Sequence, residues 1–168
     1  MLDGDDPTSL EEPGSSIDYV LVDGQSVADQ LPWLQSLYEN ELLKIASEFA
    51  GVQLAVADDL NVGVNVNSLP RAGSRYEWHM DSNPFTALLF ATTLVPGDGG
   101  ELVFRRDHVD IAVRPVAGLA LFFDARKTAH TVMPMQADVR RISLPMNYYI
   151  AGEAQTRGGL DEYLYAKS

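Results

Sequence analysis

Most of the chain after Gly51 consists of short apolar runs separated by residues that favour turns. The segment 61–67 (NVGVNVN) alternates strictly, so Val62, Val64 and Val66 would share one face of a β-strand. Many short strands with turn signals between them predict a mainly β fold, a β-sandwich or jelly roll. Further candidate strands lie at 17–22, 75–81, 85–95, 101–106, 109–116, 118–123 and 141–150.

One connecting turn has a distinctive composition. The sequence PGDGG at 96–100 separates the candidate strands 85–95 and 101–106. Asp-Gly-Gly is typical of β-hairpins, because glycine adopts positive φ without a steric penalty. The turn therefore favours a hairpin between these two strands.

A single helical segment lies between the candidate strand at 17–22 and the later candidate strands. Pro32 cannot lie inside a helix, so it should occupy the first turn, and Gly51 is a natural stop. An apolar stripe of this kind packs on a core, and we expect an N-terminal helix on one face of the jelly roll. Between Ser26 and Ala50 the stripe consists of Leu31, Leu34, Tyr38, Leu42, Ile45 and Phe49.

The first sixteen residues differ from the rest of the chain. Residues 1–16 carry five acidic residues and no basic one, so they bury too little apolar surface to offset the entropy of ordering. We expect a flexible acidic tail over 1–16 and a single domain over 17–168. The net charge of −12 argues against nucleic acid or an anionic membrane as a partner.

The absence of cysteine excludes disulfides, thiolate metal sites and a cysteine nucleophile. The N-terminal residues lack the basic and apolar regions of a signal peptide, and no apolar run is long enough to span a membrane. These observations favour a cytoplasmic protein.

Two of the three histidines stand in a pattern with a carboxylate. His79 and Asp81 are two residues apart, so they would share one face of a strand, and His130 follows after an apolar run and a loop. Two histidines and one carboxylate form a facial triad, which leaves three adjacent coordination positions of iron free. Each residue alone has an ordinary structural explanation, such as an aromatic cluster, an Asx turn or a loop histidine.

A basic residue suited to a carboxylate ligand follows the second histidine. If 141–150 is a strand, Arg141 and Ser143 share a polar face, while the intervening residues form an apolar one. Arginine binds a carboxylate in bidentate fashion and stays charged when buried. Arg140 is an alternative, a solvent-exposed basic pair is another, and Pro145 predicts an edge or a bulge in this strand.

At these positions the sequence resembles the Fe(II)/2-oxoglutarate-dependent oxygenases, and within them the prolyl-4-hydroxylase-like branch. The resemblance covers about half the chain, from Val62 to Tyr149. The motifs occur in the order found in that branch: HMD at 79–81, LLFATTLVPGDGGELVF at 88–104, RPVAGLALFFD at 114–124, HTVMP at 130–134 and RIS at 141–143.

The resemblance implies a double-stranded β-helix that uses Fe(II), 2-oxoglutarate and dioxygen. It implies that His79, Asp81 and His130 hold the iron, and that Arg141 and Ser143 hold the distal carboxylate of 2-oxoglutarate. Related halogenases replace the carboxylate ligand with a small residue, so Asp81 favours hydroxylation. The phrase WHMDSNP…LLFATT is similar to small bacterial enzymes that oxidise free amino acids or related metabolites.

Candidate substrate contacts follow from strand alternation. Arg75 and Glu77 would share a face with His79, and Asn65 and Asn67 would come from a neighbouring strand. Glu77 could pair with the ammonium of an amino acid and Arg75 with its carboxylate. The alternative is that these residues are solvated at the rim.

Other functions remain open at this point. The chain could be a peptidyl (prolyl-type) hydroxylase, a zinc-dependent hydrolase or isomerase, or a non-catalytic cupin-like metal-binding module. Its short length leaves little material for a lid, so the site is either open or completed by a partner subunit, as in a homodimer.

Overall fold

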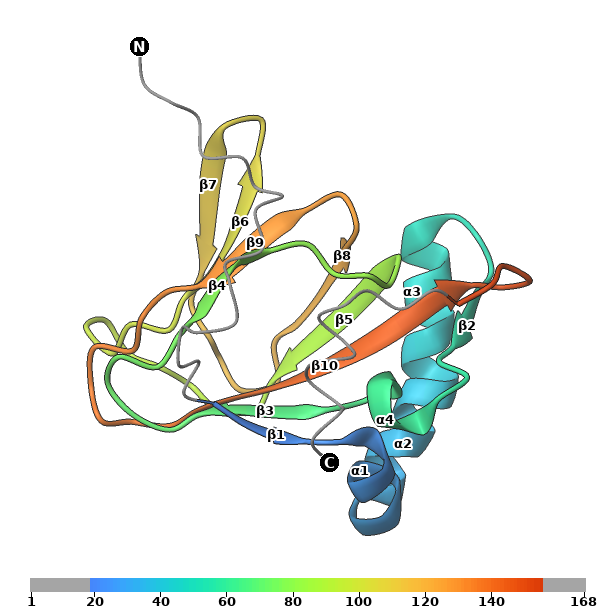
Figure 1. Cartoon of the computed structure of the whole chain (residues 1–168), viewed down its shortest axis with the longest axis horizontal. Helices are drawn as coiled ribbons and strands as arrows, with labels where there is room; N and C mark the ends of the chain where they lie inside the picture. The colour runs from blue at the N-terminus through green and yellow to red at the C-terminus, as the bar shows by residue number, and fades with distance from the viewer. Residues whose placement is uncertain (1–18, 156–168) are drawn as a thin grey trace.

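The computed structural model describes residues 19–155, so the predicted acidic tail and the residues after 155 lie outside the described part. Within it, two antiparallel sheets face each other (Figure 1). The larger sheet contains β1 (Val20–Val22), β2 (Leu54–Val56), β3 (Val66–Leu69), β5 (Phe85–Phe90), β8 (Ala120–Asp124) and β10 (Arg141–Ile150). The smaller sheet contains β4 (Tyr76–His79), β6 (Leu102–Arg106), β7 (Val109–Val113) and β9 (Ala129–Val132).

Consecutive strands alternate between the sheets from β3 to β6 and again from β8 to β10. The larger sheet has the order β1-β3-β10-β5-β8, with β2 also paired to β10, and the smaller has the order β4-β9-β6-β7. The apolar side chains between them include Leu69, Phe90, Leu102, Phe123 and Val132. This arrangement confirms the predicted double-stranded β-helix.

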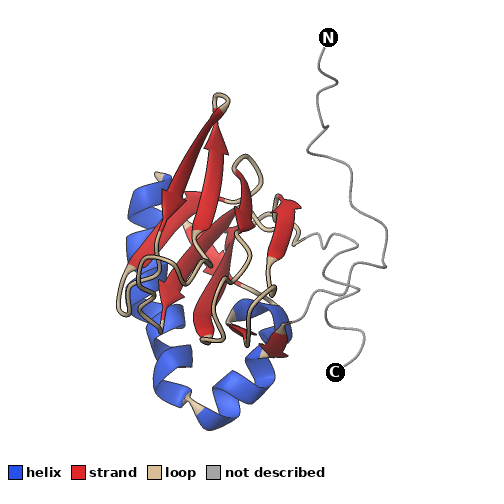
Figure 2. Ribbon diagram, turned by 90° about the vertical axis from the view of Figure 1, so that its left-hand side faces the viewer, coloured by secondary structure: helices blue, strands red, loops and turns tan. Residues whose placement is uncertain are grey.

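Helices cover the outer face of the larger sheet (Figure 2). They run as α1 (Gly24–Gln30), α2 (Pro32–Leu37), the π-helical turn η1 (Tyr38–Leu42) and α3 (Leu43–Ala50). Leu144, Met146 and Tyr148 of β10 pack against them. Pro32 occupies the first turn of α2, and Gly51 ends α3 in a left-handed conformation, as predicted.

The predicted apolar stripe is wrong in its second half. Leu34 and Tyr38 are buried, but Ile45 and Phe49 are 47% and 57% exposed, and Ala46 is buried instead. The π-helical turn is the reason. Its wider turn holds more residues than an α-helical turn, so the buried face after it moves by one position, from Ile45 to Ala46.

The predicted strand 61–67 is also wrong in its first half. Residues Leu60–Gly63 form a short helix, α4, whose N-terminus is capped by the Asp59 side chain accepting from the Asn61 amide. Gly63 lies against the ring of Tyr38, where an added Cβ would be 3.2 Å from the ring carbon Cε1. The strand β3 therefore begins only at Val66.

The turn at 96–100 does not form a hairpin. It carries the chain from β5 in the larger sheet to β6 in the smaller one, so the two strands do not pair. Its glycines are required by the local geometry, because Gly97, Gly99 and Gly100 all have positive φ. The hairpin nearby is β6–β7, whose tip is Asp107 and His108.

Pro145 was expected to mark an edge or a bulge, yet β10 lies inside the larger sheet. Pro145 pairs with Leu88 on one side, and on the other its carbonyl accepts from the amide of Asn65. Asn65 lies between the bridge at Val64 and the regular pairing of β3. The missing N–H thus faces an irregular segment of the neighbouring chain.

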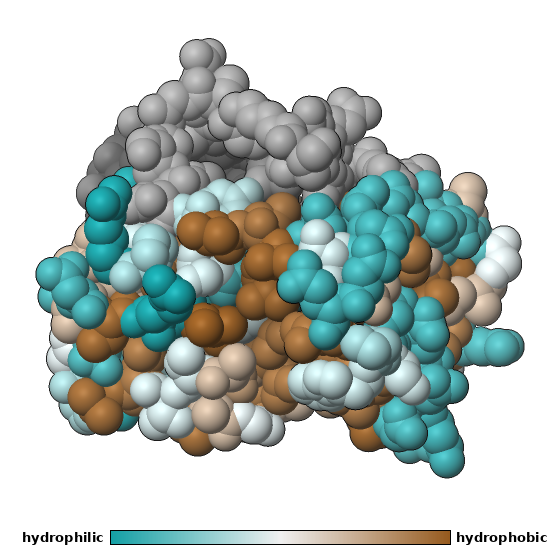
Figure 3. Space-filling model, turned by 90° about the horizontal axis from the view of Figure 1, so that it is seen from below, coloured by the Kyte–Doolittle hydropathy of each residue, from teal (hydrophilic) through white to brown (hydrophobic). Residues whose placement is uncertain are grey.

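The strand β1 lies on the lower side of the molecule in Figure 1 and forms an edge of the larger sheet. Val20 and Val22 of this strand are 55% and 38% exposed. Seen from below, apolar surface shows among polar side chains (Figure 3). In residues 19–155 no helix is both long and apolar enough to cross a membrane.

Candidate metal centre and co-substrate site

His79 and His130 are directly opposite each other on the paired strands β4 and β9. The Nδ1 of His79 is 2.7 Å from the carbonyl oxygen of Glu77, and the Nδ1 of His130 is 3.0 Å from that of Thr128. Each carbonyl accepts from a protonated Nδ1, so both Nε2 atoms carry a free lone pair. Backbone contacts therefore orient both imidazoles as metal ligands.

Asp81 completes the group, two residues after the end of β4. Its Oδ1 lies 3.6 Å from the Nε2 of His79 and 3.6 Å from the Nε2 of His130. The three side chains offer ligand atoms that all lie within 4.8 Å of one another. The arrangement expected from the sequence is present and could hold a metal ion.

The Asp81 carboxylate is held by residues that the sequence did not single out. The hydroxyl of Thr86 donates to its Oδ2 at 2.9 Å, and the Asn83 amide donates to that hydroxyl oxygen at 2.9 Å. The Asp81 main-chain amide donates to the carbonyl of Ala125 at 3.1 Å. Hydrogen bonds of this kind orient metal ligands and increase metal affinity.

The electrostatics of the site suit a metal ligand. Burial lowers the pKa of His130, the neighbouring His79 lowers it further, and Asp81 opposes both effects. A histidine with a lowered pKa is neutral at neutral pH, which is the form that binds metal. Two imidazoles and one carboxylate on one side of an ion leave the opposite side free for other ligands.

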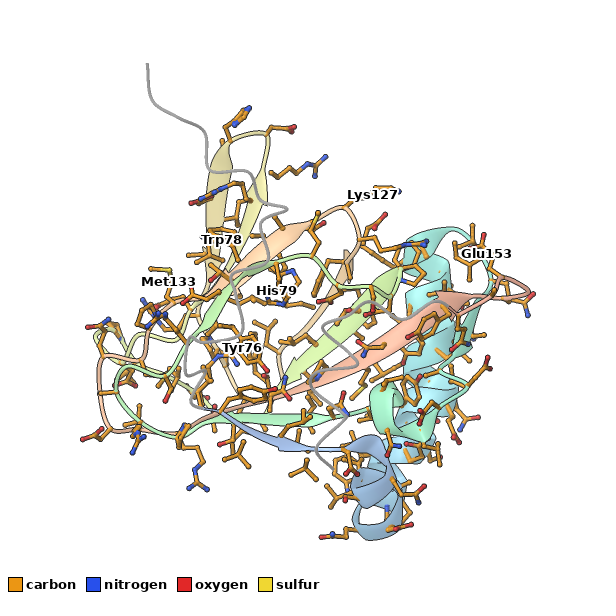
Figure 4. All side chains as sticks on the ribbon, in the orientation of Figure 1. Tyr76, Trp78, His79, Lys127, Met133 and Glu153 are labelled. Carbon is orange, nitrogen blue, oxygen red and sulfur yellow. The ribbon has the colours of Figure 1, made fainter. Side chains whose placement is uncertain are left out.

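A β-bulge in β4 changes which side chains accompany His79. Tyr76 pairs with Val132 and His79 with His130, so three steps on β4 match two on β9. Glu77 is therefore displaced to the outer face and Tyr76 shares the inner face with His79. The rings of Tyr76 and His79 are 5.8 Å apart, and Figure 4 shows both on the side of β4 that faces the larger sheet. The expected alignment of Glu77 with His79 is wrong.

Trp78 also belongs to the outer face. Its ring stacks under the guanidinium of Arg105, 4.1 Å from the ring centroid, on the side of β4 away from His79 (Figure 4). Because simple alternation assigns Tyr76 the same face as Trp78, the sequence analysis missed Tyr76.

Arg141 is buried at the other end of the space between the sheets, and only 2% of it is exposed. Its Nε donates to the carbonyl of Gly100 at 3.0 Å and its Nη1 to the hydroxyl of Ser143 at 2.9 Å. Its Nη2 is buried and has no hydrogen-bond partner. Burial lowers the pKa of Arg141 to about 10, with Tyr76 acting in the opposite direction, so the guanidinium stays charged at neutral pH.

Gly100 is necessary for this arrangement. Its φ is +72°, and an added Cβ would lie 2.5 Å from the sulfur of Met135 and 3.3 Å from the Cδ of Arg141. A side chain here would collide with the residues around the guanidinium. The glycine of the turn at 96–100 therefore serves the arginine rather than a hairpin.

Arg140, the alternative to Arg141, is exposed and lies just before β10. Arg141 and Ser143 lie on the inner face of β10, whereas Leu144 and Met146 pack into separate apolar surroundings beneath the helices. The face assignment made from the sequence is therefore correct for this strand, and only Arg141 of the two arginines lies inside the fold.

The residues expected to contact substrate are placed differently. Arg75 and Glu77 form an ion pair with each other, and their side chains are 49% and 35% exposed. Asn65 is buried, and its Nδ2 donates to the carbonyl of Asn61 at 2.7 Å. β3 and β4 belong to different sheets, so these residues do not come from neighbouring strands.

A family comparison agrees with this geometry. Residues 64–149, just over half of the chain, match the model of the 2OG-Fe(II) oxygenase superfamily. The chain belongs to this family. Its members use Fe(II), 2-oxoglutarate and dioxygen, so the protein is a 2-oxoglutarate-dependent dioxygenase. No curated protein sequence matches the chain.

Solved structures share the fold. A prolyl-4-hydroxylase from Pseudomonas putida is 23% identical, with a TM-score of 0.53 over 80% of this chain and 72% of that one. The non-heme alpha-ketoglutarate-dependent carbocyclase SnoK of nogalamycin biosynthesis is 19% identical, with a TM-score of 0.66 over 92% and 74%. A prolyl hydroxylase from Trichoplax adhaerens, solved with a peptide fragment, is 17% identical, with a TM-score of 0.61 over 79% and 62%.

Proposed function

We propose that this dioxygenase hydroxylates an unactivated C–H bond of a small metabolite, an amino acid or a derivative of one. The observation that carries the proposal is the pairing of two features inside one barrel. His79, Asp81 and His130 converge at one end, and a buried arginine with an unpartnered N–H lies at the other. A metal ion and an anion bound together would satisfy both.

The residues present fit the two ligands. His79, Asp81 and His130 would hold Fe(II) on one side of the ion. Arg141 and Ser143 would hold the distal carboxylate of 2-oxoglutarate, since Nη2 lacks an acceptor and a carboxylate supplies one. A strongly acidic protein repels a dicarboxylate, so a positive charge inside the fold is needed to attract it.

When bound, iron with 2-oxoglutarate and dioxygen supplies oxidative decarboxylation to succinate and carbon dioxide, coupled to oxidation of a C–H bond. The protein contributes binding, orientation and exclusion of water. Thr86 fixes the Asp81 carboxylate, and the carbonyls of Glu77 and Thr128 fix the imidazoles. Phe90, Leu69 and Leu94 keep the surroundings of Arg141 apolar, which strengthens its interaction with an anion.

Asp81 supports hydroxylation over halogenation. A carboxylate occupies the position that a halide needs, and its second oxygen is already engaged by Thr86. We expect Asp81→Gly to abolish hydroxylation. Alcohol product at the wild-type rate in that variant would remove Asp81 from the set of metal ligands.

The β6–β7 hairpin supplies an apolar surface near the metal residues. Phe104 is opposite His130 on one side and Ile111 on the other, so all three side chains share a face. Ile111 and Val109 of this hairpin are 50% and 60% exposed, and the hairpin projects beyond the other strands (Figure 1). The exposed apolar face of the hairpin, beside the metal residues, favours a substrate with an apolar portion.

A substrate role for Arg75, Glu77 and Asn65 stays a prediction from the sequence. Their positions in the structure do not favour that role. Assembly as a homodimer and residence in the cytoplasm also stay predictions. A peptidyl hydroxylase is the alternative, because the structurally similar proteins include prolyl hydroxylases.

Anaerobic titration of the protein with Fe(II) and then 2-oxoglutarate tests the proposal directly. We expect a complex with visible metal-to-ligand charge-transfer absorption, followed by substrate-dependent succinate release in air. A panel of free amino acids set against proline-containing peptides separates the two substrate classes. Failure to form the complex would overturn the proposal. The alternative of a zinc-dependent hydrolase or isomerase predicts a different result, because such an enzyme does not need the arginine and would keep its activity in Arg141→Ala.

A further inference from the structure

Asn67 lies beside Arg141 on the inner face of the larger sheet. β3 and β10 are antiparallel, and Asn67 is directly opposite Ser143 in their register. Opposite residues in an antiparallel pair project their side chains to the same face, with Cβ atoms about 5 Å apart. Arg141 is two residues from Ser143 and its Nη1 reaches the Ser143 hydroxyl. The tip of the guanidinium and the Asn67 side chain are therefore both neighbours of Ser143 on the inner face.

The Asn67 amide has an unsatisfied atom at this place. Within residues 19–155, four buried side-chain atoms lack a hydrogen-bond partner: Gln35 Oε1, Asn67 Oδ1, Ser74 Oγ and Arg141 Nη2. Asn67 and Arg141 are diagonal neighbours across the β3–β10 pair. Burying a polar group without a partner costs about 1–3 kcal/mol, so two such groups at diagonal positions on one face indicate a ligand that contacts both.

We propose that Asn67 is a third binding residue for the distal carboxylate of the co-substrate, with Arg141 and Ser143. The inference rests on the proposed function and extends it to a residue outside the recognised motifs. A carboxylate only accepts hydrogen bonds, so the amide presents Nδ2 to it. A half-turn about the last side-chain bond exchanges Nδ2 with Oδ1 and brings the donor to the buried position.

The neighbouring side chains favour recognition of a charged end. Ser143 is flanked by Asn67 on β3 and by Phe90 on β5, and Arg141 lies opposite Leu69. Phe90 and Leu69 are fully buried. In these apolar surroundings each hydrogen bond to a carboxylate is stronger than in water. Asn67 should therefore contribute to selectivity for 2-oxo acids that carry a second carboxylate.

The test compares two 2-oxo acids that share the metal-chelating end. 2-Oxoglutarate has a distal carboxylate and pyruvate has none, so only the former can contact Asn67. Wild type, Asn67→Ala, Asn67→Asp and Ser68→Ala are loaded with Fe(II) without oxygen and titrated with each acid. Ser68 is the matched control, since it is the next residue on β3 and its side chain faces the other side of the sheet.

We expect Asn67→Ala to weaken 2-oxoglutarate binding about tenfold, the effect of one hydrogen bond to a charged group. Asn67→Asp should weaken it further, because it adds a negative charge beside the carboxylate. Pyruvate binding and the unfolding temperature should change little in Asn67→Ala, and Ser68→Ala should match wild type for both acids.

Two results would overturn the inference. Unchanged 2-oxoglutarate affinity in Asn67→Ala would remove Asn67 from the binding site. An equal loss for both acids would show a general effect on the fold or the metal. The proposed function itself fails, and this inference with it, only if the wild-type protein binds neither acid.

Discussion

The two ends of the site lie on opposite sheets and differ in how their polar groups are satisfied. At the metal end, backbone carbonyls hold both imidazoles and Thr86 holds Asp81, and the side chains of His79 and Asp81 are 17% and 20% exposed. At the co-substrate end, Arg141 is almost completely buried and one of its nitrogens has no partner. Among the described residues of the two ends, Arg141 at the second end has a buried polar atom without a hydrogen-bond partner, and His79, Asp81 and His130 at the first have none.

This difference has consequences for affinity and stability. Ligands already held in place lose little entropy when they bind an ion, so the metal end is preorganised. A buried guanidinium carries a desolvation cost of several kcal/mol that is repaid only with good partners. Changes at the metal end should therefore affect metal affinity with little effect on the fold, whereas changes at Arg141 should affect both co-substrate affinity and the free energy of unfolding.

The largest expected effect is at Asp81. Asp81→Gly removes the only acidic ligand of the three, and hydroxylation should fall below detection while the unfolding temperature without metal stays close to that of wild type. Product analysis by mass spectrometry and circular dichroism measure the two quantities. A large drop in the unfolding temperature would instead assign Asp81 a structural role and weaken the contrast between the two ends.

Arg141→Ala should have the next largest effect. It removes at least two hydrogen bonds to a charged ligand, each worth about 1.5–3 kcal/mol, so 2-oxoglutarate affinity should fall about a hundredfold or more. Metal affinity should be unchanged. Arg140→Ala is the matched control, because Arg140 is the preceding residue and is exposed. Calorimetric titration with metal and then with 2-oxoglutarate separates the two affinities.

The same position also tests the stability part of the comparison. Replacing a buried charge with an apolar side chain of similar size is often neutral or stabilising by about 1–4 kcal/mol. Arg141→Met without ligand should therefore unfold at or above the wild-type temperature. In wild type, 2-oxoglutarate at about a hundred times its Kd should add about 2.7 kcal/mol of stability, and this increment should be absent in Arg141→Met.

The sequence analysis predicted the ends of the site better than the structure around them. His79, Asp81 and Arg141 were recognisable because chemistry and spacing mark them. The strand pattern predicted a β-sandwich or jelly roll, and the family resemblance implied the double-stranded β-helix. The strand β9, which carries His130, was missed because AHTV is short and follows a loop without apolar alternation. Its pairing with β4 depends on tertiary structure, which local pattern does not encode.

Residues that hold or neighbour the ligands were harder to predict. Tyr76 and Glu77 were assigned to the wrong faces because a single bulge inverts the alternation. Thr86 supports Asp81 from a strand of the other sheet. Asn67 was considered as a substrate contact, but its position opposite Ser143 depends on the β3–β10 register, which the sequence does not show.

Thr86→Val probes the metal end without removing a ligand. Valine has a similar shape but cannot donate to Asp81, so the carboxylate loses the hydrogen bond that orients it. Metal affinity should fall about tenfold to a hundredfold, as is typical when such a supporting residue is lost. At saturating metal, 2-oxoglutarate affinity should match that of wild type. Unchanged metal affinity would show that Asp81 is held without Thr86.

The smallest expected effect is for Ser143→Ala at the co-substrate end. The change leaves the Nη1 of Arg141 without its acceptor and removes one donor to the carboxylate, while the guanidinium stays in place through Gly100. One hydrogen bond to a charged group, at the lower limit of about 1.5 kcal/mol, corresponds to about tenfold in 2-oxoglutarate affinity. Metal affinity should be unaffected, which is the reverse of the pattern expected for Thr86→Val. If Ser143→Ala and Thr86→Val both weaken metal and 2-oxoglutarate to the same degree, the two ends do not act separately, because independent sites require each variant to affect only its own ligand.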